Sequence, residues 1–133
     1  MEYHEFITHV QSLAQSNSRE EAELAARATL ETIKERIADS EIQDLAAQLP
    51  QELSSYLRGQ EPASSQVFNL QEFIERVSEK EKIEPTTTAI HVRAVFAVLQ
   101  NAINPEKFSQ FQGHFTHDYE ELFAAPPTSG VHA

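Results

Sequence analysis

The chain has 133 residues and a formal net charge of −11, from 10 Lys and Arg against 21 Asp and Glu. Its length suits one domain that buries about two thirds of its unfolded surface, and its acidity opposes binding to nucleic acid or to anionic lipid. The absence of Cys excludes disulfides, thiol nucleophiles and thiolate metal sites. Since neither a run of about 20 apolar residues nor a basic leader occurs, we expect a cytoplasmic protein without a membrane segment.

The first half of the chain has helical periodicity. Apolar residues recur every three or four positions, which places them along one face of a helix. These residues are Phe6, Val10 and Leu13, then Ala26, Leu30, Ile33 and Ile37. Ser18 with Glu21 has the spacing of a capping box, in which the hydroxyl accepts from a first-turn amide, and predicts a helix start. Ser40 with Gln43 predicts another start, and Pro50 suits the first turn of a fourth helix.

The second half carries the same kind of markers. Its periodic apolar residues are Phe73 and Val77, then Val92, Phe96, Leu99 and Ile103. Pro85 and Pro105 suit first helical turns, where the missing amide hydrogen costs nothing. Asn104 and Thr116 are predicted N-caps. Because no alternating strand pattern occurs, the sequence predicts an all-α fold.

The two halves match each other residue by residue. The offset is 67 residues in the first helix of each half and 66 thereafter. The apolar pairs are Phe6 with Phe73, Val10 with Val77, Leu30 with Phe96, Ile33 with Leu99, Ile37 with Ile103, Ile42 with Phe108, Leu45 with Phe111, Leu49 with Phe115, Leu53 with Tyr119, and Leu57 with Phe123. Core positions agree while surface positions have drifted, which is typical of two copies of one fold.

The matches predict tandem duplicated four-helix units, about eight helices, packed as one pseudo-symmetric bundle. A single copy of about 55 residues would bury only a marginal core, so we expect the copies to share an apolar seam. Residues 1–58 form the first copy and residues 68–124 the second. Residues 59–67, where Gly59 can end the fourth helix, are predicted to be a linker. Residues 125–133 lack periodic apolar content and are predicted to be a disordered tail.

Three segments of the first half carry a family resemblance. They are EFITHV, ELAARATLETIKERI and DLAAQLPQEL. Together they resemble the bacterial domain-of-unknown-function family 2267, and the second half resembles a diverged copy of the same unit, over residues 2–124 in all. Gln48-Leu49-Pro50 is the most specific part, and the second copy departs from it with His114-Phe115-Thr116. The resemblance implies an all-helical bacterial protein of uncharacterised function, and it carries over no catalytic or binding residues.

Two charged positions recur in both predicted copies. Glu5 and Arg27 have Glu72 and Arg93 as their counterparts, although other exposed positions diverged. One interpretation is an interhelical ion pair in each copy, Glu5 to Arg27 and Glu72 to Arg93. The other is that the two Arg side chains capture an anionic ligand at the seam between the copies.

One cluster contains residue types that bind metals. His114 and His117 are three residues apart and Asp118 follows. Because Thr116 is a predicted N-cap, it would break the helix that a shared ion requires. The first copy has no equivalent cluster, and the set lacks a third well-placed ligand. We therefore interpret these three as surface residues at a helix corner and predict no cofactor.

Catalysis finds little support in the sequence. There is no nucleophile elbow and no HExxH motif, and the many carboxylates are explained by helix starts and solvated faces. His91 lies beside an apolar residue, and we expect it to be exposed or half-buried rather than catalytic. The sequence therefore predicts a protein that is not an enzyme.

The remaining hypothesis is an interaction or adaptor module that binds a protein partner or self-associates. A surplus of aromatic residues in the second half would become an interface if it were exposed, although a core position explains each of them. These residues are Phe68, Phe108, Phe111, Phe115 and Phe123. The alternative is a small-anion or metal-binding protein that uses the cleft between the copies, through Arg27 and Arg93 or through His114 and His117.

Overall fold

The computed structural model describes residues 1–37, 39–58 and 67–123. We call residues 1–58 the first half and residues 67–123 the second half. The predicted linker, including Gly59, and the predicted tail fall almost entirely on residues 59–66 and 124–133, which lie outside the described residues.

Within the described residues the fold is all-α, as predicted. The helices are α1 (Tyr3–Ala14), α2 (Arg19–Arg36), α3 (Asp39–Ala47), α4 (Gln51–Arg58), α5 (Leu70–Glu81), α6 (Pro85–Ala102), α7 (Pro105–Gln112), the 3-10 helix η1 (His117–Tyr119) and α8 (Glu120–Phe123). None of the helices in this part of the chain combines the length and the apolar character needed to cross a membrane.

Two predicted helix starts in the first half have different outcomes. Ser18 is the N-cap of α2, and its hydroxyl accepts a hydrogen bond from the amide of Glu21 at 3.2 Å. The carboxylate of Glu21 accepts from the hydroxyl of Ser16 instead of reaching back to the Ser18 amide. The prediction for Ser40 was wrong, because α3 begins at Asp39. Ser40 therefore lies inside the first turn, where its hydroxyl donates to the neighbouring carboxylate of Glu41.

The asparagine marker and two of the three proline markers behave as expected, whereas Pro50 directly precedes α4 instead of lying in its first turn. Pro85 and Pro105 are the first residues of α6 and α7. Asn104 caps α7 through its side-chain oxygen, which accepts from the amide of Glu106 at 2.8 Å. Thr116 precedes a 3-10 turn rather than an α-helix, and its side chain makes no capping hydrogen bond. These caps satisfy amides that have no partner inside the helix.

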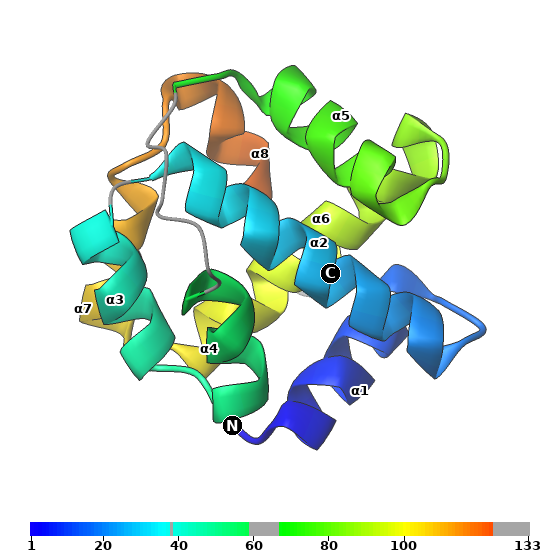
Figure 1. Ribbon diagram of the computed structural model, residues 1–133, viewed down its shortest axis with the longest axis horizontal. Helices are drawn as coiled ribbons and strands as arrows, with labels where there is room; N and C mark the ends of the chain where they lie inside the picture. The colour runs from blue at the N-terminus through cyan, green and yellow to red at the C-terminus, as the bar shows by residue number, and fades with distance from the viewer. Residues whose placement is uncertain (38, 59–66, 124–133) are drawn as a thin grey trace, which may run out of the picture.

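The two long helices α2 and α6 cross at the centre of the molecule (Figure 1). Helix α1 packs against both α2 and α6, and α5 likewise packs against both. Helix α4 covers α2, α8 covers α6, and α3 lies against α7. Each half therefore supplies its first helix to the long helix of the other half, so the halves share one core.

The apolar residues of the predicted repeat lie in or against that core. All are buried except Phe115 and Phe123, which are half-buried and pack on the others. The aromatic surplus of the second half forms a cluster around Phe96, with the rings of Phe111 and Phe115 only 5.0 Å apart. These rings are core contacts and not an exposed docking patch.

Candidate functional site

A cavity of about 170 Å³ opens between α3 and α7, where the two halves meet. Its lining comprises Glu41, Asp44 and Leu45 from α3, Lys107, Gln110 and Phe111 from α7, and His114 just beyond α7. Leu45 and Phe111 are buried, whereas the polar lining residues are partly or fully exposed. The cavity therefore has an apolar floor and a polar rim.

The lining is built from matched positions of the two halves. Glu41 and Lys107, Asp44 and Gln110, and Leu45 and Phe111 are each separated by 66 residues. The apolar pair kept its character, but the polar pairs did not. Carboxylates line the α3 side, while an ammonium and an amide line the α7 side.

His114 is the only member of the predicted metal cluster that reaches the cavity. Its Nε2 lies 3.9 Å from a carboxylate oxygen of Glu41. His117 is exposed and pairs with Glu120 in its own turn, at 3.1 Å from Nδ1 to the carboxylate oxygen. Asp118 caps α5 by accepting from the Leu70 amide. Among the described residues, no three His, Asp or Glu side chains are grouped to hold a metal ion.

Asp118 is held ionised by its neighbours. The hydroxyl of Thr116 and the amide of Leu70 donate to the two oxygens of its carboxylate. These hydrogen bonds lower the pKa of Asp118, because both favour the charged form. Asp118 therefore ties the corner after α7 to the start of α5.

The predicted interhelical ion pair of the first half is wrong. The Nε of Arg27 lies 3.2 Å from the carboxylate of Glu31, one turn later on the same helix, and its guanidinium lies over the ring of Tyr56. The carboxylate of Glu5 accepts from the amide of Glu2 in the first turn of α1. Residues four apart on a helix are close neighbours, so each side chain finds a local partner first.

The predicted pair of the second half is also wrong, because Arg93 and Glu72 each have another partner. Arg93 contacts Glu121 on α8, at 3.3 Å from Nη2 to the carboxylate oxygen. Glu72 pairs with Arg76, one turn later in α5, at 2.7 Å. Arg27 and Arg93 thus face different helices and each has its own carboxylate, which argues against joint capture of one anion.

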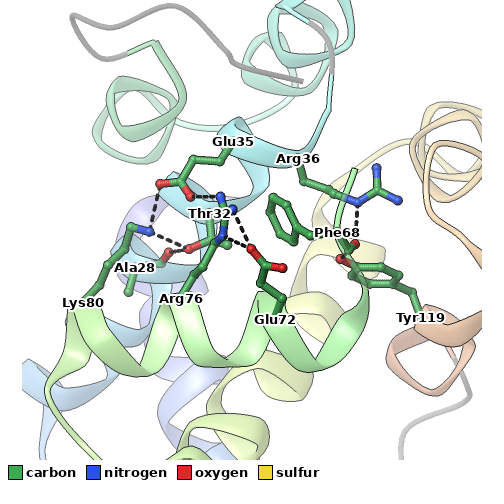
Figure 2. A network of polar contacts seen from close by, with 9 residues as sticks. All are labelled: Ala28, Thr32, Glu35, Arg36, Phe68, Glu72, Arg76, Lys80 and Tyr119. Carbon is green, nitrogen blue, oxygen red and sulfur yellow. Dashed lines mark hydrogen bonds and ion pairs between the residues drawn. The ribbon is translucent and has the colours of Figure 1, made fainter. Parts of the chain in front are cut away.

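Arg76 is the centre of a charged network between α5 and α2 (Figure 2). Its guanidinium pairs with Glu35 at 2.9 Å as well as with Glu72, and it lies over the ring of Phe68 at 3.9 Å. Lys80 pairs with the other carboxylate oxygen of Glu35 at 2.9 Å and donates to the hydroxyl of Thr32. The two carboxylates raise the pKa of Arg76 despite its partial desolvation. This network fastens the first helix of the second half onto the first half.

Arg36, at the end of α2, is buried beside this network (Figure 2). Its Nε donates to the carbonyl of Phe68 at 3.1 Å and its Nη1 to the carbonyl of His114 at 3.2 Å. The guanidinium lies within 6 Å of three ring centres, those of Phe68, Phe115 and Tyr119. One side chain of the first half thereby holds two separate segments of the second half. Sequence reasoning missed it.

Tyr119 completes this arrangement. Its hydroxyl donates to the same Phe68 carbonyl at 2.6 Å. Burial raises the pKa of Tyr119 to about 12, because the phenolate would be poorly solvated. Tyr119 therefore stays a neutral donor throughout the physiological range. The matched position in the first half is Leu53, so this hydrogen bond exists in the second half only.

His91 is buried, so the expectation that it would be exposed or half-buried was wrong. Its Nδ1 lies 2.9 Å from a carboxylate oxygen of Glu81, and the two side chains are 4% and 1% exposed. The other oxygen of Glu81 has no hydrogen-bond partner. The matched residues of the first half are Ala25 and Ala14, so the pair exists in the second half only. At these two matched positions the first half has small residues and the second half has an acid and a histidine. That difference was the only signal for the pair in the sequence.

This pair predicts a pH dependence of stability. The hydrogen bond that His91 donates to the Glu81 carboxylate raises the pKa of His91, outweighing desolvation, and the negative charge of Glu21 adds to the effect. His91 therefore holds its proton more tightly when folded. The stabilisation is fully present below the unfolded pKa of about 6.5 and is lost as the pH rises through the folded pKa.

Urea denaturation between about pH 6 and pH 9 measures this effect. We expect the free energy of unfolding to fall with rising pH in the parent. The decline should be absent from a variant carrying both Glu81→Met and His91→Leu. An identical slope in parent and variant would exclude His91 as its source.

Comparison with known proteins assigns no activity to these features. Residues 3–122 match the model of a protein family described as "Uncharacterized conserved protein (DUF2267)". No curated protein matches the chain. The cavity, the charged network and the buried pair all lie inside the matched region.

Proposed function

The chain belongs to the DUF2267 family of uncharacterized conserved proteins, and from this premise we propose that it is a non-enzymatic interaction module that binds a protein partner. The module consists of two tandem copies of a four-helix unit and works in the cytoplasm of a bacterium. The absence of Cys is compatible with that reducing compartment.

The duplication is supported by the helices themselves. Helices α1 and α5 both have 12 residues, and α2 and α6 both have 18. Helices α1 and α5 end with left-handed residues, Gln15 and Lys82, which stand 67 residues apart. Neither residue is Gly, the usual choice for that conformation, so the shared backbone feature is specific.

One observation carries the proposal: the same exposed apolar position occurs in both halves. Leu24 is the sixth residue of α2 and Ile90 the sixth of α6, and they are 40% and 46% exposed. Three residues later stand Arg27 and Arg93, whose side chains are 59% and 53% exposed. We call Leu24 with Arg27 the α2 patch, and Ile90 with Arg93 the α6 patch.

Leu24 and Ile90 are exposed, so burial in the core does not explain why both halves have an apolar residue there. Other exposed positions of the two helices differ, as where Glu20 matches Thr86. Residues three apart lie on one helix face, so each patch presents an apolar side chain next to a guanidinium. That combination is typical of interface centres, where Arg is enriched. The fitting partner segment presents an apolar side chain to Leu24 or Ile90, beside an Arg that already pairs with Glu31 or Glu121, and a partner can engage one or both patches.

The test is a double variant, Leu24→Gln with Ile90→Gln, compared with a control at two exposed polar positions, Gln43→Ala with Gln100→Ala. For both double variants we expect the free energy of unfolding to change by no more than about 0.5 kcal/mol per substitution, because all four side chains are solvent-exposed. We expect a partner that cross-links to the parent in its own cells to be lost from the patch variant and kept by the control. Identical cross-linked partners in all three proteins, or none in any, would contradict the proposal.

The alternative, a small-anion or metal-binding protein using the cleft between the halves, finds less support. Arg27 and Arg93 are engaged with separate carboxylates. His114 reaches the cleft, but His117 does not. The cavity in that cleft does support the binding of a small molecule, but one whose charge differs from that of an anion or a metal ion.

A further inference from the structure

The cavity between α3 and α7 has the size of a very small ligand. Its volume of about 170 Å³ exceeds the space of several waters, each of which occupies about 30 Å³. It falls below the roughly 300 Å³ at which pockets for drug-sized molecules begin. A molecule of amino-acid size fits this range, and the buried Leu45 and Phe111 offer it an apolar floor.

The two walls of the cavity carry opposite character. On the α3 side, Glu41 and Asp44 present carboxylates. On the α7 side, Lys107 presents an ammonium and Gln110 an amide, and His114 adds an imidazole. The walls approach closely, because the imidazole lies 3.9 Å from the Glu41 carboxylate. One small molecule can therefore reach both walls at once.

This polarity decides what the cavity can hold. The lining carries two carboxylates and one ammonium, so a simple anion meets more like charge than opposite charge, and a simple cation leaves Lys107 without a partner in the ligand. A molecule with both charges pairs with each wall and leaves neither group facing a like charge. We propose that this cavity binds a small zwitterion, with its ammonium toward Glu41 and Asp44, its carboxylate toward Lys107, and an apolar body over the floor. A free apolar amino acid is the simplest such ligand.

The site is independent of the α2 and α6 patches, because no residue is shared between them. Its origin follows from the matched positions of the lining. A cavity lined by identical residues from both halves would have equal walls. Here Glu41 and its counterpart Lys107, and Asp44 and its counterpart Gln110, line the same cavity with different charges, so the difference between the halves polarises the cavity.

The experiment is a titration of the full chain followed by backbone amide chemical shifts in two-dimensional NMR. The zwitterionic probes are alanine, leucine and phenylalanine. For leucine, the matched probes are N-acetyl-leucine, which keeps only the carboxylate, and leucinamide, which keeps only the ammonium. We expect saturable shifts confined to α3, α7 and their neighbours with at least one zwitterion, and binding weaker by about tenfold or more with each matched probe.

Variants separate the site from the fold. Glu41→Gln and Lys107→Gln should each weaken binding by about tenfold, since each removes one charged contact, whereas Glu75→Gln on the exposed face of α5 should leave it unchanged. All three positions are exposed or half-buried, and an unchanged spectrum away from the substitution verifies folding. The proposal is overturned if no zwitterion gives saturable shifts, if the shifts lie elsewhere, or if leucinamide or N-acetyl-leucine binds as tightly as leucine.

Discussion

Replacing His91 with Leu is expected to lower the free energy of unfolding by about 3–5 kcal/mol, the usual cost of removing one partner from a buried ion pair. The substitution leaves the Glu81 carboxylate, 1% exposed, without the hydrogen bond that compensates its burial. One oxygen of that carboxylate already lacks a partner. Glu81 must then lose its charge or draw water into the core, and both cost free energy.

The double variant Glu81→Met with His91→Leu distinguishes the loss of the ion pair from the loss of packing around it. Replacing a buried ion pair by apolar residues of similar volume is often neutral. We therefore expect the second substitution to recover most of the loss, as measured by urea denaturation followed by circular dichroism. If the double variant is as unstable as His91→Leu alone, the loss reflects packing around His91 and not the unpaired carboxylate.

Replacing Arg36 with Met is the second change with a large expected effect, a loss of about 3 kcal/mol. Each hydrogen bond from a charged group contributes about 1.5–3 kcal/mol, and a desolvated cation over an aromatic ring up to about 2. Met fills part of the same space but leaves the carbonyl of His114 without its donor. The carbonyl of Phe68 keeps the hydroxyl of Tyr119, which limits the damage.

Two further substitutions make this result specific. Arg36→Lys keeps the charge but lacks the forked guanidinium that donates to both carbonyls. We therefore expect its free energy of unfolding to lie between those of the parent and Arg36→Met. Arg58→Met, at an exposed position of α4, should change stability by less than about 0.5 kcal/mol. Equal stability of parent and Arg36→Lys in urea denaturation would show that charge alone, without the fork, is what this position needs.

The periodicity of apolar residues predicted most of the fold, because burial of one helix face depends on spacing alone. Pro85, Pro105 and the caps Ser18 and Asn104 marked helix starts correctly, because they act within a few residues. The prediction that a helix starts at Ser40 failed because several nearby polar residues can start the same helix. The spacing of a hydroxyl and a later polar side chain does not show which of them does.

The candidate sites were less accessible to sequence reasoning, because they depend on which helices meet. Arg27 and Arg93 were recognised by their repetition, yet their ion partners stand one turn away and on α8. Arg36 matches Ala102, and His91 matches Ala25, so repetition directed attention away from both. The cavity requires α3 to lie against α7, which no local pattern encodes.

The crossing of α1 and α5 between the halves has a consequence for how the protein comes apart. Helix α1 packs on α6 and α5 packs on α2, so separating the halves would strip an apolar face from both long helices. Neither half can melt while the other stays native. We therefore expect the described residues of both halves to unfold as one cooperative unit. A destabilising substitution in either half therefore lowers the stability of both halves. The α2 patch, the α6 patch and the cavity all depend on the same folding equilibrium.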